Sequence, residues 1–137
     1  MRRLAVFVAL VFFLAGCSGG QPAQVDPIIP EIIDMTIVID GQRQAIKEGK
    51  DYQLGNQQYF DLQVSDNVTD VEFLFFPEYA ERSQALLSQG TKISDGVFRI
   101  EWYENVSGIG YFLAYSLSEG KNIAVRSGEF SLSVPNC

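Results

Sequence analysis

The stretch Phe98-Arg99-Ile100-Glu101-Trp102 alternates large apolar side chains with charged ones. Successive side chains of a β-strand point to opposite faces, so this pattern is typical of a strand with one buried face. Trp102 is the single tryptophan of the chain and shares its phase with Phe98 and Ile100. We therefore expect Trp102 to pack at the centre of a core between two sheets.

The same alternation recurs on both sides of that stretch. The phases predicted to point inward are Phe60, Leu62 and Val64; Val71, Phe73 and Phe75; and Phe130, Leu132 and Val134. A further β-rich run, Met35–Ile39, ends at Asp40-Gly41, a dipeptide typical of tight hairpin turns. Many short strands separated by turns predict an all-β antiparallel sandwich, which we place at residues 32–137.

One segment departs from this rhythm. The stretch 77–90 begins with Pro77, carries acidic residues in its first turn and ends at Gly90. These are start and stop signals of a helix, and Tyr79 and Leu86, seven positions apart, would share one helical face. We therefore predict one short helical connection between two strands.

Composition narrows the classes of function. The chain has 137 residues, with 10 Lys and Arg, 17 Asp and Glu, and no His. The lack of His excludes His-dependent catalysis and His-ligated metal sites. The acidic balance disfavours nucleic-acid binding, which needs clustered Lys and Arg. We find no enzyme signature, so we expect a non-catalytic protein without a cofactor or metal ion.

The order of several short motifs resembles that of the bacterial immunoglobulin-like repeats of secreted and surface proteins. The matching motifs are Val71-Glu72-Phe73, Gly90-Thr91, Phe98–Trp102, Gly110-Tyr111-Phe112-Leu113, Glu119–Asn122 and Phe130–Val134, so the resemblance covers about residues 35–134. It implies an immunoglobulin-like sandwich. It also implies the roles common in that family, which are spacer, adhesive stalk and accessory domain rather than one shared activity.

The N-terminus has the pattern of an export signal. Arg2 and Arg3 precede the 11-residue apolar run Leu4–Leu14, which is too short to span a membrane. Leu14-Ala15-Gly16-Cys17 resembles the lipobox of bacterial lipoproteins, in which the cysteine carries the lipid and cleavage falls before it. That resemblance implies a signal peptide at 1–16, lipidation of Cys17 and attachment to a membrane of the bacterial cell envelope.

A short tether follows the predicted lipidation site. The segment 17–31 contains Ser-Gly-Gly, Pro22, Pro27 and Pro30 and has no alternation of polar and apolar residues. Loss of residues 1–16 would move the formal charge from −7 to −9, because Arg2 and Arg3 leave with the signal.

Alternation also predicts an apolar patch on an outer sheet face. If Phe73, Phe75, Tyr111 and Leu113 point inward, the residues between them point outward, and their strands are neighbours in an immunoglobulin-like sheet. The predicted binding residues are Leu74, Phe76, Phe112 and Ala114. Either they bind a protein partner, or the helix-like segment 78–89 folds over them and makes them core.

Other side chains suggest weaker alternatives. A glycan-binding module would use Tyr59, Tyr103 or Trp102 as outward stacking platforms. The acidic segment Asp66–Asp70 favours a turn over a calcium site, because it lacks a spaced series of ligands. Glu72, Glu101 and Glu104 are expected to be solvated carboxylates. The sequence thus favours a lipid-anchored, protein-binding module, with glycan binding as the alternative.

Overall fold

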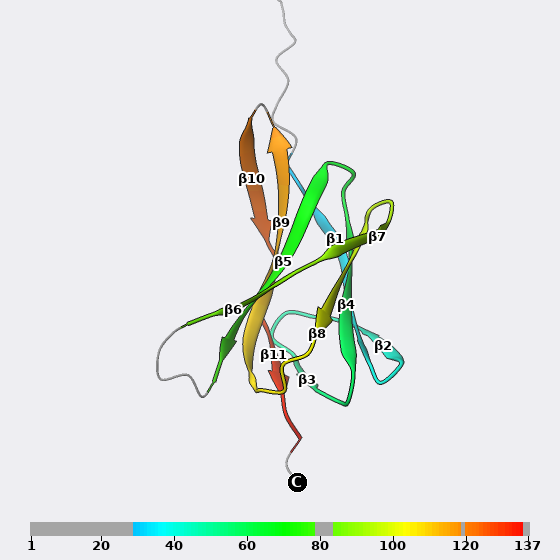
Figure 1. Ribbon diagram of the computed structural model, residues 1–137, viewed down its shortest axis with the longest axis vertical. Helices are drawn as coiled ribbons and strands as arrows, with labels where there is room; N and C mark the ends of the chain where they lie inside the picture. Colours follow the sequence, from blue (N-terminus) through cyan, green and yellow to red (C-terminus); the bar gives the residue numbers. More distant parts are fainter. Residues whose placement is uncertain (1–28, 79–83, 119, 136–137) are drawn as a thin grey trace, which may run out of the picture.

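The computed structural model describes residues 29–78, 84–118 and 120–135, and within these ranges it contains strands but no helix (Figure 1). One sheet has the order β2-β1-β4-β8-β7, and the other has the order β3-β11-β9-β5-β6 with β10 also paired to β9. The first sheet comprises β1 (Ile32–Ile39), β2 (Gln42–Ala45), β4 (Gln58–Val64), β7 (Thr91–Ser94) and β8 (Val97–Trp102). The second comprises β3 (Asp51–Gln53), β5 (Val68–Pro77), β6 (Leu86–Gln89), β9 (Gly108–Ser118), β10 (Lys121–Arg126) and β11 (Phe130–Ser133). The pair β3–β11 is parallel and the other pairs are antiparallel.

The turn between β1 and β2 has the predicted form. Asp40 and Gly41 have φ values of 48° and 86°, and they join Ile39 directly to its cross-strand partner Gln42. Positive φ at both central residues matches the twist of a two-residue hairpin, and aspartate followed by glycine adopts it at low cost. The dipeptide therefore fixes the register of the first hairpin.

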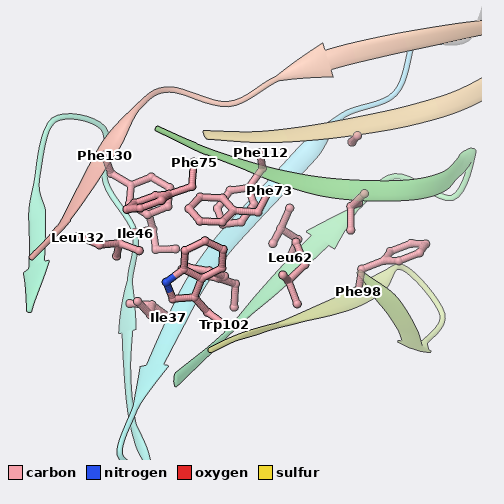
Figure 2. Packing of buried hydrophobic residues seen from close by; sticks show 14 of the residues in the cluster. Ile37, Ile46, Leu62, Phe73, Phe75, Phe98, Trp102, Phe112, Phe130 and Leu132 are labelled. Atoms are coloured by element: carbon pink, nitrogen blue, oxygen red, sulfur yellow. The ribbon is translucent and has the colours of Figure 1, made fainter. Parts of the chain in front are cut away.

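The core lies between the two sheets and combines a cluster of aromatic rings with aliphatic side chains (Figure 2). The phases predicted to point inward on β4, β5, β8 and β11 do so, with Val134 only partly buried. Phe73 is at the centre of the cluster, with its ring centroid 4.7 Å from Phe60 and 5.0 Å from both Trp102 and Phe112. Trp102 is buried at the centre of this core, as predicted. The alternation pattern therefore predicted the all-β sandwich correctly.

The described part of the predicted helix contains a strand and no helical turn, so the helix prediction is wrong there. Leu86–Gln89 form β6, which pairs with β5, while residues 79–83 lie outside the described ranges. Gly90 does not cap a helix. It carries the chain from β6 in one sheet to β7 in the other, and a Cβ atom there would clash with Cγ2 of Val71. Pairing of Leu86 with Phe75 across the sheet overrides the local helical pattern.

A bulge divides the strand that runs beside β9 into β10 and β11. Arg126 pairs with Leu113 and Phe130 pairs with Gly110, so the three residues 127–129 lie opposite two residues of β9. The backbone N–H of Phe112 donates to Oγ of Ser127 at 2.8 Å, and the N–H of Ser127 donates to the carbonyl of Phe112 at 2.9 Å. A serine hydroxyl thus replaces one backbone acceptor where the ladder is interrupted.

Candidate functional site

The structure corrects half of the predicted binding patch. Leu74 and Phe76 lie on the outer face of the second sheet, as predicted, and Phe76 is 37% exposed. Phe112 and Ala114 do not share that face, because both are fully buried in the core. The predicted phase of β9 is therefore wrong by one residue, and Tyr111 and Leu113 take the outward positions.

Small residues explain this phase. The inward positions of β9 are Gly108, Gly110, Phe112, Ala114 and Ser116. A Cβ atom on Gly108 would stand 2.6 Å from Cζ of Phe75, and one on Gly110 would stand 2.5 Å from Cζ of Phe73. The inner face of β9 must be small here because β5 places two phenylalanine rings against it. Gly108 and Gly110 are therefore the feature of the sequence that indicates which phase of β9 faces the core.

The residues that do lie together form an apolar surface across β5, β6 and β9. We define the outer-sheet patch as Leu74, Phe76, Leu87, Ile109, Tyr111 and Leu113. Leu74 pairs with Leu87 on one side and with Tyr111 on the other, which gives a continuous row across three strands. The rings of Phe76 and Tyr111 are 6.0 Å apart. The described part of the segment 78–89 therefore extends this face and does not cover it.

Charged groups fix the orientation of two tyrosines on the same face. The guanidinium of Arg126 lies 4.2 Å from the ring centroid of Tyr111. The hydroxyl of Tyr115 donates to Oε1 of Glu72 at 2.8 Å. Burial and this bond to a carboxylate raise the pKa of Tyr115 to about 12, so the phenol is a neutral donor at physiological pH.

An acidic hollow of about 380 Å³ adjoins the patch at the ends of β5 and β9. Phe76 and Ile109 form its apolar wall, and Asp51 and Glu78 contribute carboxylates. Each carboxylate oxygen of Asp51 accepts a serine hydroxyl, from Ser131 at 2.8 Å and from Ser133 at 2.7 Å. The patch therefore borders oriented negative charge on this side.

The outer face of the first sheet has a different character. The carboxylate of Asp61 accepts two hydrogen bonds from Arg99, at 2.8 and 3.0 Å. It also forms an ion pair with Arg43, with 3.1 Å between the charged atoms. Burial alone would raise the pKa of Asp61, but the hydrogen bonds and charges of the two arginines outweigh it and lower the pKa. The guanidinium of Arg99 also lies 4.0 Å from the ring centroid of Tyr59.

The three residues proposed for glycan binding are placed differently. Trp102 is 3% exposed and offers no surface platform, so that part of the alternative is wrong. Tyr59 is half-buried, and Tyr103 is 82% exposed. Tyr59 and Tyr103 line the same surface hollow at one end of the first sheet.

The other polar candidates form no metal site within the ranges described by the structure, which hold no group of three or more His, Cys, Asp or Glu placed to bind an ion. Asp66 and Asn67 form the turn between β4 and β5, as the sequence favoured. Glu101 and Glu104 are exposed, and Glu72 is half-buried beside Tyr115. In the same ranges, no helix is long and apolar enough to cross a membrane. Cys17 and the proposed tether fall almost entirely in residues 1–28, which the structure does not describe.

Comparison with protein-family models and with curated proteins gives no match to this sequence.

Proposed function

We propose that the protein is a lipid-anchored module of the bacterial cell envelope and that it binds another protein through the outer-sheet patch. The observation that carries this proposal is the continuous apolar row of Leu87, Leu74 and Tyr111 on an outer sheet face. A contiguous apolar surface on a soluble domain is typical of an interaction site. No catalytic role is needed to account for it.

The make-up of the patch fits a protein interface. Aromatic residues are enriched where protein partners meet, because a tyrosine or phenylalanine ring buries a large area with few rotatable bonds to immobilise. Phe76 and Tyr111 provide two such rings in contact. Arg126, stacked on Tyr111, and Glu72, bonded to Tyr115, give the apolar centre a polar border. This is the usual division between the core and the rim of an interface.

Charge indicates the chemistry of the partner. The chain has a formal charge of −7, and Asp51 and Glu78 lie beside the patch without an ion pair in the described structure. An acidic surface speeds association with a basic one and disfavours acidic competitors. We therefore propose a partner that presents an apolar centre flanked by lysine or arginine.

The order of strands supports an immunoglobulin-like form of the sandwich. The first sheet contains β1-β4-β8-β7, which corresponds to strands A, B, E and D of that fold. In the second sheet β5, β9 and β11 occupy the places of strands C, F and G. The outer-sheet patch would then lie on the face formed by strands C and F.

The anchor is tested at Cys17. Replacement by serine removes the thiol that forms the lipid thioether, so Cys17→Ser should move the protein from the detergent phase to the aqueous phase on phase partitioning. Cys137→Ser, which changes the only other cysteine, is the matched control and should leave partitioning unchanged. Retention of Cys17→Ser in the detergent phase would contradict lipidation.

The binding proposal is tested with the full chain in native membranes. Phe76→Ser combined with Ile109→Ser removes apolar surface from the patch, and Ile93→Ser on β7, the control, removes one exposed apolar side chain from the other sheet. After mild crosslinking, we expect one stoichiometric protein partner with the parent chain and with Ile93→Ser. The double variant should lose it, with a much smaller loss of stability than removal of a core ring causes. Unchanged capture by the double variant would overturn the patch as the binding site.

A further inference from the structure

We propose that the hollow at the end of the first sheet, separate from the outer-sheet patch, binds a neutral oligosaccharide. The hollow has a volume of about 570 Å³. The residues that line it include Tyr59, Tyr103, Asn56, Gln57 and Glu101. Small-molecule sites in proteins span about 300–1,000 Å³ and combine apolar surface with a few oriented polar groups, as this hollow does.

The ring of Tyr59 is held in place, and the ring of Tyr103 is exposed to solvent. Tyr59 is held by the guanidinium of Arg99, which is itself fixed by its two hydrogen bonds to Asp61. Tyr103 follows the last residue of β8 and is 82% exposed, the highest exposure among the large hydrophobic side chains of the described structure. An aromatic ring left so open in a hollow gives a flat surface on which the apolar face of a sugar ring can stack.

The segment 55–58, which also lines the hollow, is held by hydrogen bonds in the absence of a ligand. Oδ1 of Asp40 accepts the backbone N–H groups of Asn56 and Gln57, each at 2.9 Å, and the N–H of Asp40 donates to the carbonyl of Gln57 at 2.8 Å. The side chain of Gln58 accepts from the N–H of Gly55 at 2.9 Å and donates to the carbonyl of Trp102 at 3.4 Å. A loop fixed in this way loses little entropy on binding.

The exposed polar side chains of the hollow can form hydrogen bonds with the hydroxyl groups of a sugar. The side chains of Asn56, Gln57 and Glu101 are exposed while their backbones are held. A side-chain amide both donates and accepts, and a carboxylate accepts only, so together they can satisfy neighbouring hydroxyls that need both kinds of partner. Glu101 is the one charged residue among those that line the hollow. With the acidic charge of the chain, it selects against anionic sugars.

Binding is tested by calorimetric titration of the full chain in a detergent without a sugar headgroup. The probes are chitohexaose, cellohexaose and maltohexaose, three neutral oligosaccharides that differ in linkage and substituents. We expect one of them to bind. Tyr103→Ala should then weaken that binding by about tenfold, the effect of removing one stacked ring. Tyr103→Phe keeps the ring and should stay within about threefold of the parent.

Failure of this proposal is separable from failure of the proposed protein-binding function. Phe76→Ser with Ile109→Ser should leave sugar affinity unchanged, and Tyr103→Ala should leave capture of the protein partner unchanged. Absence of binding for all three probes at millimolar concentration would overturn the oligosaccharide site. Equal affinity of the parent chain and Tyr103→Ala would overturn it as well.

Discussion

The ring of Phe73 occupies the space that a side chain on Gly110 would need. A Cβ atom at Gly110 would stand 2.5 Å from Cζ and 2.6 Å from Cε1 of Phe73, and 2.8 Å from the carbonyl oxygen of Leu74. Real Cβ atoms essentially never approach other heavy atoms so closely. The bulk of β5 thus requires a glycine on β9, and that glycine fixes which side chains of β9 face outward.

Gly110→Ala should destabilise the domain by about 1–3 kcal/mol, the usual cost of forcing extra atoms into a packed core. The ring of Phe73 cannot retreat easily, because it contacts Phe60, Trp102 and Phe112. Thermal unfolding of the full chain in detergent measures the effect. Ile109→Ala, next along β9 but on the outer face, is the control and should change the melting temperature much less. Equal losses in the two variants would contradict the assigned phase.

Phe112→Ala should cost about 3–5 kcal/mol, because the side chain is fully buried and its removal leaves a cavity. Phe76→Ala should cost far less, because that ring is 37% exposed. Urea unfolding of the two variants, followed by the fluorescence of the single tryptophan, gives the comparison. If Phe76→Ala were as damaging as Phe112→Ala, the patch would be core and not an interaction surface.

Trp102→Ala should also cost about 3–5 kcal/mol, since the indole is 3% exposed and packs on Phe75 at 5.0 Å. Trp102→Phe should cost less than half of that. The indole Nε1 has no hydrogen-bond partner among the described residues, so phenylalanine gives up packing but no hydrogen bond. Circular dichroism during urea unfolding reports on both variants. Equal costs for alanine and phenylalanine would contradict packing as the main contribution of the indole.

Asp61→Asn should lower the melting temperature at pH 7, because it removes the acceptor charge shared by Arg99 and Arg43. The arginines lower the pKa of Asp61 below its ordinary value of 3.8. Its contribution is therefore complete above that value and is lost as the pH falls through the lower pKa of the folded state. The difference between parent and variant should therefore shrink as the pH falls below about 4.

The control for Asp61 is Asp95→Asn, which removes an exposed ion pair with Lys92 whose atoms are 4.0 Å apart. Pairs of this kind contribute little, so Asp95→Asn should leave the melting temperature unchanged at both ends of the range. A constant difference between the parent chain and Asp61→Asn from pH 7 to pH 2 would contradict the lowered pKa.

The strand at Phe98–Trp102, which has one apolar phase, could be predicted from the sequence, whereas alternation alone did not decide β9, which has two. Phe98, Ile100 and Trp102 alternate with charged or polar neighbours, so a single orientation buries them. Along β9 both phases are apolar, because Tyr111 and Leu113 alternate with Phe112 and Ala114. The alternation of side chains then does not indicate which of the two sets is buried. The choice is made by Phe73 and Phe75 of β5, which meet Gly110 and Gly108 from 37 and 33 positions away in the chain.

The error at Leu86–Gln89 has a similar origin. Proline, acidic residues and a terminal glycine are local helix signals, but β5 has a free edge that Leu86 and Leu87 can pair with. In a strand these two leucines separate, with Leu86 packed against the core and Leu87 in the outer-sheet patch. The pairing of Leu86 with Phe75 joins consecutive strands, but the local helix signals do not show it. The arginines around Asp61 come from two other strands, so they cannot be read from the residues next to it.

The bulge at 127–129 bears on how the domain behaves when many copies are crowded together. An uninterrupted outer strand offers unpaired backbone groups to a second chain, and sheets that join in this way grow into aggregates. Here that strand is broken into β10 and β11, and β3 covers the outer side of β11. The other outer strands are short, with three residues in β3 and four each in β2, β6 and β7. With its borders interrupted or short, the domain can expose an apolar face without inviting edge-to-edge polymerisation.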